Sequence, residues 1–243
     1  MIFLRNTLFL FLSISLLSCA HTQLETERIA IPRTSFVEIK ALVRKPDCRK
    51  DRCGWKVMAA FSSGVIIKRD NIGSYVLGAE HVCRIQSFES QPDVKVRFTV
   101  MGVGGTEYIA DVLVVDKEND LCVFYVRRMR YGQIVKIRNH PPKFGEKVYN
   151  LASPLGFAHP PTTIPVFIGH YSGFKNGMDV YTIPAKGGSS GSPIFDVEGK
   201  LLGILVGHLK GFNQISVSPR FSSVKKIVDE ILSGKYSVGG NDD

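Results

Sequence analysis

Short apolar runs broken by turn residues repeat along most of this chain, and they constrain its fold more than any other feature. Between residues 94 and 100, valine and phenylalanine alternate with polar residues, which is the two-residue period of a half-buried strand. Similar runs lie on both sides of this segment, separated by Gly, Pro, Asn and Asp. The pattern predicts an all-β fold, built as barrels or as a sandwich.

One α-helix is expected near the C-terminal end. Its apolar residues recur three and four positions apart: Val224, Ile227, Val228, Ile231 and Leu232. Ser222 or Ser223 is placed to cap its start, and Gly234 to end it. We expect the apolar stripe of this helix to pack on the second group of strands.

The composition is that of a globular protein with a basic surface. Of 243 residues, 44% are hydrophobic and 22% are charged, which allows a real core. The formal net charge is +9, but the cationic residues are scattered and no basic motif is interleaved with aromatic residues. No nucleic-acid partner is therefore expected, although an anionic envelope surface would attract such a charge.

Residues 1–19 read as a targeting segment for export. Arg5 supplies a positive start, and the apolar stretch from Thr7 to Leu17 is short for a bilayer span. The segment ends at Cys19, where it resembles a lipobox whose cysteine is lipidated; an ordinary cleaved signal peptide is the alternative. The expected location is the periplasm or a membrane to which lipidated Cys19 attaches the chain, or otherwise the outside of the cell.

Four further cysteines fit an oxidising compartment: Cys48, Cys53, Cys83 and Cys122. Three disulfide connectivities are open, and buried free thiols at Cys83 and Cys122 are an alternative. Cys83 follows His81 by two residues and Cys122 follows Asp120 by two, so these cysteines are expected to be close if the polar pair meets. No metal is expected, since the spacings typical of zinc ligands are missing from the sequence.

A serine in a glycine-rich turn is the strongest chemical feature of the chain. Ser190 lies in the run Gly-Gly-Ser-Ser-Gly-Ser-Pro at 187–193, and such a turn exposes a hydroxyl while its amides point at a developing oxyanion. His81 and Asp120 lie upstream, each beside an apolar run, in the order His, Asp, Ser known for nucleophilic triads. Histidine activates the hydroxyl and the carboxylate fixes the histidine tautomer. The N–H groups of Gly188 and Ser190 are the candidate oxyanion hole.

Each of these residues also has an ordinary interpretation. Ser190 is compatible with a plain turn, His81 with a surface loop and Asp120 with a turn after a charged run. Their order and apolar surroundings together favour catalysis.

Four segments resemble a known family. Residues 78–82 (Gly-Ala-Glu-His-Val) and 119–123 (Asn-Asp-Leu-Cys-Val) are similar to the His and Asp signatures of trypsin-like serine proteases, of the bacterial HtrA/Deg-like or glutamyl-endopeptidase-like branch. Residues 144–156 resemble the start of the second barrel of that family, and 188–193 its nucleophile turn. The resemblance covers roughly residues 36–220.

The resemblance implies two antiparallel six-stranded β-barrels of the chymotrypsin type, a C-terminal helix and no PDZ domain. It also implies hydrolysis of a polypeptide substrate through an acyl-enzyme, without a cofactor. By this resemblance, Pro184 lies at the base of the pocket that binds the residue before the cleaved bond. The wall of the same pocket is formed by Leu205, Val206 and Gly207. Since none of these residues is charged, we expect a small or apolar residue there. The alternative function is a catalytically silent module that binds peptides.

The expected organisation follows from these observations. Its parts are a signal peptide at 1–19, a linker at 20–34, a first barrel at 35–128, a second at 129–221, a helix at 222–234 and a disordered tail at 235–243.

Overall fold

The computed structural model describes residues 30–49, 52–91, 93–236 and 238. The expected leader, its Cys19 and most of the expected tail lie outside the described residues. Among the described residues, no helix is long and apolar enough to cross a membrane.

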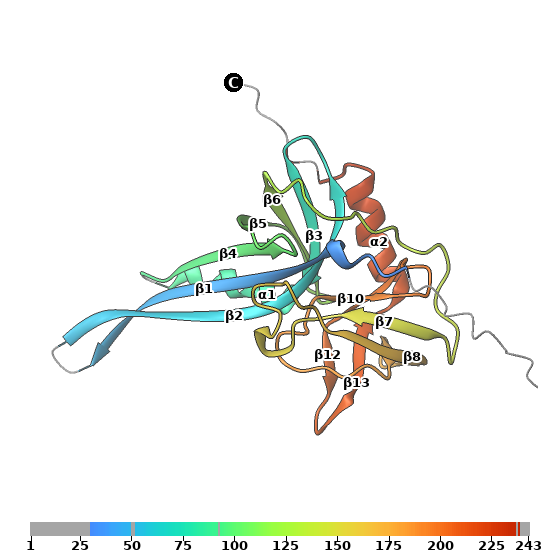
Figure 1. Cartoon of the computed structure of the whole chain (residues 1–243). Helices are drawn as coiled ribbons and strands as arrows, with labels where there is room; N and C mark the ends of the chain where they lie inside the picture. Colours follow the sequence, from blue (N-terminus) through green and yellow to red (C-terminus); the bar gives the residue numbers. More distant parts are fainter. Residues whose placement is uncertain (1–29, 50–51, 92, 237, 239–243) are drawn as a thin grey trace, which may run out of the picture.

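The first half of the chain forms a closed six-stranded antiparallel barrel, in the order β1-β2-β3-β6-β5-β4 (Figure 1). Its strands are β1 (Phe36–Arg49), β2 (Arg52–Arg69), β3 (Gly73–Ala79), β4 (Lys95–Gly102), β5 (Glu107–Asp116) and β6 (Leu121–Arg127). Aliphatic and aromatic side chains alternate inward from these strands, as the two-residue period requires. Ile39, Val65, Leu77, Val100 and Phe124 are among those buried in its interior.

The second half forms a seven-stranded sheet, in the order β11-β10-β7-β8-β9-β13-β12. Its strands are β7 (Lys147–Leu151), β8 (Val166–Lys175), β9 (Met178–Tyr181), β10 (Ser192–Phe195), β11 (Leu201–Leu205), β12 (Gly207–Leu209) and β13 (Phe212–Pro219). The amide of Val206 donates to the carbonyl of Val217, which brings the two ends of the sheet together. The expected all-β class is therefore confirmed. The seventh strand arises because the ladder is interrupted at Val206, which divides one run into β11 and β12.

Two helices and three 3-10 turns complete the fold of the described residues. The short helix α1 (Glu80–Cys83) follows β3, and α2 (Phe221–Leu232) follows β13. The 3-10 turns are Arg33–Ser35, Arg84–Ser90 and Pro154–Gly156. The apolar stripe of α2 is buried in a core that also includes residues of the first barrel, so this helix covers both halves.

The start of α2 differs from the expectation. Neither Ser222 nor Ser223 caps the helix; Arg220 is the N-cap residue and makes no side-chain cap bond. Instead the buried carboxylate of Asp179, on β9, accepts a hydrogen bond of 2.8 Å from the amide of Phe221. A tertiary contact thus replaces the local cap, while Gly234 follows the helix with a positive φ as expected.

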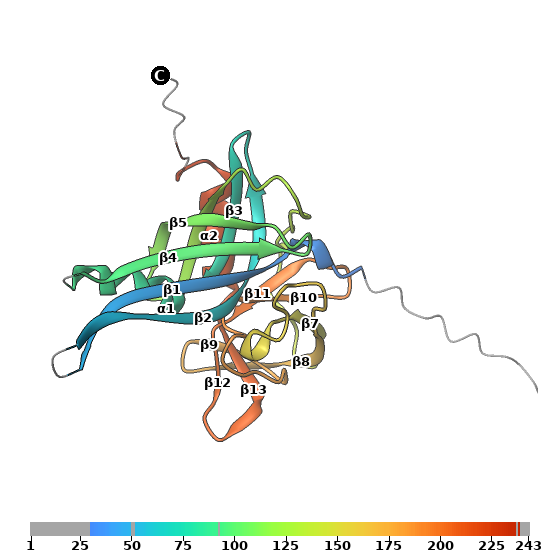
Figure 2. The ribbon, with the colours of Figure 1, turned by 60° about the vertical axis from the view of Figure 1, so that its left-hand side comes forward.

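The β1–β2 hairpin extends well beyond the barrel as a narrow arm, seen in both ribbon views (Figures 1 and 2). β1 and β2 pair without a register shift from Phe36↔Val65 to Arg49↔Arg52. Near its tip a disulfide joins Cys48 to Cys53. The arm ends far from the C-terminal helix but shares β2 with the region around Ser190.

Candidate active site

His81 and Asp120 form a close pair. The carboxylate of Asp120 lies 2.9 Å (Oδ2) and 3.0 Å (Oδ1) from Nδ1 of His81, and Oδ1 also accepts a 2.9 Å bond from the His81 amide. Both side chains are about one-third exposed. This geometry holds the proton on Nδ1 and leaves Nε2 available to a partner.

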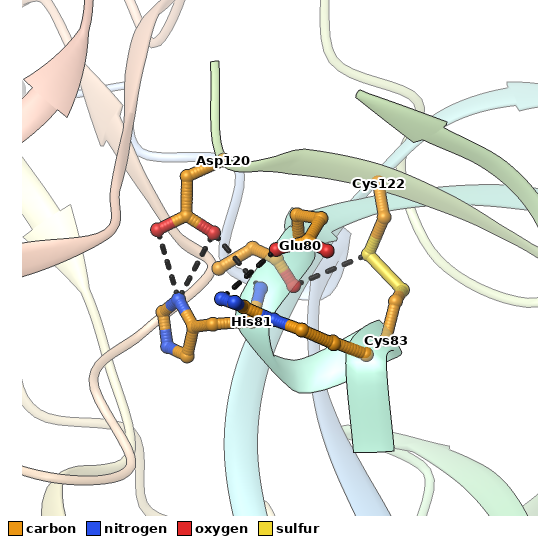
Figure 3. The surroundings of a disulfide bond; sticks show 7 residues. Glu80, His81, Cys83, Asp120 and Cys122 are labelled. Atoms are coloured by element: carbon orange, nitrogen blue, oxygen red, sulfur yellow. Dashed lines mark hydrogen bonds and ion pairs between the residues drawn. A yellow bond between two sulfur atoms is a disulfide. The ribbon is translucent and has the colours of Figure 1, made fainter. Parts of the chain in front are cut away.

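The backbone around this pair is fixed by covalent and hydrogen bonds (Figure 3). The amide of Glu80 donates to the carbonyl of Asp120, which has a positive φ of 51°. Two residues further on, Cys83 and Cys122 form a disulfide with a Cα–Cα distance of 6.5 Å. Of the alternatives open at the sequence level, the structure therefore contains a bridge between the cysteines that follow His81 and Asp120.

Ser190 is held at the junction of the two halves. The amide of Ser63, on β2, donates a 2.8 Å hydrogen bond to the Ser190 carbonyl, and the amide of Gly191 donates to the Leu205 carbonyl at 2.7 Å. Gly191 has a φ of +84°, and a Cβ there would clash with the carbonyl oxygen of Ser63 and approach the amide of Ala79. The turn that holds Ser190 therefore packs against β2 and against the end of β3, the strand that leads into His81.

The structure brings these residues into one region without joining all three. Among the described residues, the hydroxyl of Ser190 has no hydrogen-bond partner, and no bond links it to the ring of His81. The Ser190 side chain is half-buried.

Backbone amides of the turn that donate no hydrogen bond lie next to Ser190. The N–H groups of Ser189, Gly191 and Ser192 all donate within the fold, whereas those of Gly187, Gly188 and Ser190 donate to none of the described residues. Gly188 has a φ of +96°, and a Cβ there would clash with the carbonyl of Ser153. Only glycine fits at position 188. The amides of Gly188 and Ser190 are therefore both available as hydrogen-bond donors near the Ser190 hydroxyl.

A buried polar network supports this turn from behind, and sequence reasoning missed it. Ser63 donates through its hydroxyl to the Gly188 carbonyl (2.9 Å) and accepts from the Ser153 amide (3.1 Å). The Ser153 hydroxyl donates to Oε2 of Glu38 (2.8 Å). Oε1 of the same carboxylate lies 2.5 Å from Nδ1 of His159. A chain of contacts thus runs from a carboxylate on β1 to the carbonyl of Gly188.

One sequence signal pointed toward this network. Glu38 stands among Phe36, Val37 and Ile39, and a carboxylate within an apolar strand usually has a partner. The partner could not be read from the sequence, because His159 looks like a solvated histidine beside a proline. In the structure that ring also lies against Phe61, with 5.1 Å between the ring centroids.

The residues expected to form the substrate pocket lie around the second sheet. Leu205 and Val206 are buried, and Pro184 and Gly207 are half-buried. Their role stays a prediction. Within the described ranges, no group of three or more His, Cys, Asp or Glu residues is arranged to hold a metal ion.

Comparison with known proteins connects this geometry to a family. The family model of the trypsin-like peptidase domain matches residues 62–204. None of the curated proteins compared with the sequence matches it.

Solved structures show the same fold. The Rv3671c protease from M. tuberculosis, in its active form, is similar with a TM-score of 0.62 and 18% identity, over 82% of each chain. The serine endoprotease from Yersinia pestis is similar with a TM-score of 0.62 and 17% identity, over 86% of this chain and 67% of that chain. The matched family model covers more than half of the sequence, so this chain belongs to the trypsin-like peptidase family and is a serine endopeptidase.

Proposed function

We propose that Ser190 is the nucleophile, His81 its general base and Asp120 the residue that orients the histidine. The observation that carries this proposal is the pair of unused amides at Gly188 and Ser190, beside a hydroxyl at the junction that also holds His81. Nε2 of His81 would take the Ser190 proton as the hydroxyl attacks a peptide carbonyl. The two amides would then stabilise the oxyanion.

The remaining steps follow from the same groups. Protonated His81 gives its proton to the leaving amine, so the peptide bond breaks and an acyl-enzyme remains on Ser190. His81 then takes a proton from a water molecule that attacks the acyl carbonyl, and it returns this proton to the Ser190 oxygen as the carboxylic acid product leaves. This sequence requires the Ser190 hydroxyl to rotate toward Nε2 when substrate binds, because the two groups are not hydrogen-bonded in the free enzyme.

The finer parts of the proposal concern substrate and location. Pro184, Leu205, Val206 and Gly207 would line the pocket for a small or apolar residue before the cleaved bond, since none of them carries a charge. The apolar leader and Cys19 would direct export and attach the enzyme to a membrane through a lipid. The two disulfides agree with an oxidising compartment.

A fluorophosphonate probe tests the catalytic roles. The wild-type enzyme should be labelled at Ser190, and Ser190→Ala should lose both labelling and peptide hydrolysis while it keeps its melting temperature. His81→Ala should also escape labelling, because the hydroxyl then lacks its base. Tight peptide binding without turnover or labelling in the wild type would instead support a silent binding module.

A further inference from the structure

Within the part of the chain that the structure describes, no strand lies beside the outer edge of β2 along most of the arm. β2 pairs with β1 from Arg52 to Val65, but with β3 only from Val65 onward. Among the described residues, the segment from Trp55 to Phe61 makes no backbone hydrogen bond on the side away from β1. Residues 55–60 of this segment are exposed, with 52% of Trp55 and 62% of Val57 accessible to solvent, and Phe61 is half-buried.

The register shows which residues present their backbone groups on this edge. Ser63 donates through its amide to Ser190, and its carbonyl faces Gly191, so both groups point away from β1. Because β1 and β2 pair without a bulge, every second residue repeats this orientation. The N–H and C=O groups of Phe61, Ala59, Val57 and Trp55 therefore face the open edge.

The other end of the arm gives the same orientation independently. Directly opposed residues lie about 4.5 Å apart between Cα atoms in a non-hydrogen-bonded pair and about 5.5 Å in a hydrogen-bonded pair. Cys48 and Cys53 oppose each other with a Cα–Cα distance of 4.0 Å. Cys53 thus belongs to the non-hydrogen-bonded set, and its backbone groups point outward like those of Val57 and Ser63.

We infer that this edge is a docking strand for the part of a polypeptide substrate that follows the cleaved bond. The inference rests on the proposed function of Ser190. The segment at Leu205–Gly207 lies on one side of the Ser190–Gly191 peptide and β2 on the other, so the two parts of a substrate separate there. A substrate leaving the site along β2 adds an antiparallel strand to the arm.

Two features of the β2 edge indicate which polypeptide binds there: the edge continues directly from the candidate active site, and its far end is positively charged. From Phe61 to Trp55 the open edge spans about 20 Å, enough for about six extended residues beyond those that lie next to Ser190. The guanidinium of Arg44 lies 4.3 Å from the ring centroid of Trp55, and Lys45 opposes Lys56 across the hairpin. The best substrate is therefore an extended segment with acidic residues toward its far end.

A length series of substrates tests the docking strand. Peptides share one sequence up to the cleaved bond and extend two, four, six or eight residues beyond it. We expect kcat/KM to rise on the order of tenfold from two to eight residues, because several backbone hydrogen bonds are gained. N-methylation of one backbone amide of the peptide at a time should abolish the gain in kcat/KM only at every second position after the cleaved bond. A flat length series, or no alternation, overturns the inference.

Val57 offers a matched pair of variants. Val57→Pro removes one outward amide without touching the bonds to β1, and proline is tolerated on such an edge. Val57→Ala removes side-chain surface but keeps the amide. The ratio of kcat/KM for the longest and shortest substrates should fall in Val57→Pro and largely persist in Val57→Ala. An equal fall in both variants would assign the effect to the side chain and contradict the docking strand.

Trp55 provides a readout that does not depend on hydrolysis, because it is the single tryptophan of the chain. In Ser190→Ala, the eight-residue extension should change Trp55 emission at lower peptide concentration than the two-residue form. This result would hold even if the wild type cleaved no peptide, which separates the docking strand from the proposed catalysis. Absence of any change at Trp55, or a concentration-dependent dimer that Val57→Pro dissociates, would overturn the inference.

Discussion

The hydroxyl of Ser63 donates a 2.9 Å hydrogen bond to the carbonyl oxygen of Gly188. This bond crosses from the first barrel to the turn before Ser190. The same hydroxyl accepts the amide of Ser153, which in turn contacts Glu38. The orientation of Gly188, and with it one candidate oxyanion donor, is therefore set partly by residues of the first barrel.

Ser63→Ala should reduce kcat more than it changes KM. The loss of a buried hydrogen bond that fixes Gly188 is worth about 1–2 kcal/mol, or about five- to thirtyfold in kcat. Ser62→Ala is the control, because the buried Ser62 hydroxyl has no partner among the described residues. Steady-state kinetics with a short peptide, together with melting temperatures, check the prediction. Equal losses in both variants would show that Ser63 acts only through packing.

Gly188→Ala should lower kcat/KM on the order of a hundredfold or more, because the added Cβ clashes with the Ser153 carbonyl and turns the amide away. Gly187→Ala is a matched control one residue earlier, where a Cβ meets no atom within 4 Å. Active-site titration would separate a lower rate from a smaller active fraction. Normal turnover in Gly188→Ala would remove this amide from the mechanism.

The two disulfides should differ in their effects on stability. Replacing Cys83 and Cys122 with serine opens a loop with a sequence separation of 39, against 5 for Cys48 and Cys53. The chain-entropy estimate is about 4 kcal/mol for the first bridge and about 2 kcal/mol for the second. Urea unfolding without reductant measures both. Activity should fall with the first replacement, because that bridge fixes the helix that carries His81.

The surroundings of Asp70 predict that part of the free energy of unfolding depends on pH. Burial acts to raise the pKa of its carboxyl, but hydrogen bonds from the amides of Gly73 and Ile72 and the hydroxyls of Tyr75 and Tyr125 together lower that pKa below the ordinary 3.8. The charged form is thus favoured in the folded state. Its stabilisation is present above pH 3.8 and is lost as the pH falls through the lower folded pKa.

Asp70→Asn should therefore destabilise the fold at pH 7 by about 1 kcal/mol, a modest value because Asp70 is only partly buried and solvent screens its charge. The difference from the wild type should shrink as the pH falls below 3.8. Chemical unfolding at neutral and acidic pH compares the two proteins. A difference that stayed constant across this range would contradict the role of the charge.

The all-β architecture and the C-terminal helix could be predicted from the sequence, because strand periodicity, helical periodicity and turn residues are local signals. All but the first residue of the alternation at 94–100 lies within β4, and the helical stripe at 224–232 falls within α2. The prediction that Ser222 or Ser223 caps α2 was wrong for a physical reason. The carboxylate of Asp179, more than forty positions upstream, accepts the hydrogen bond from the amide at the start of the helix. A sequence shows that the first amides of a helix need an acceptor, but the residue that supplies the acceptor need not be close in the sequence.

The same division holds at the site. The chain order of His81, Asp120 and Ser190 and the glycines of the turn were legible, because this chemistry needs those residue types. The contact of His159 with Glu38, and of Ser63 with Gly188, joins residues more than a hundred positions apart. Nothing in the local sequence around these residues specifies that pairing.

The sequence by itself determined the fold class and the resemblance to the family, and it supplied the candidates for the reactive groups, since these depend on residue type and short-range spacing. Only the tertiary structure decided how β2 serves both as a wall of the barrel and as an open edge, and which amides near Ser190 remain unpaired. A backbone group is free or bonded according to what lies across from it in space, and folding alone fixes those neighbours.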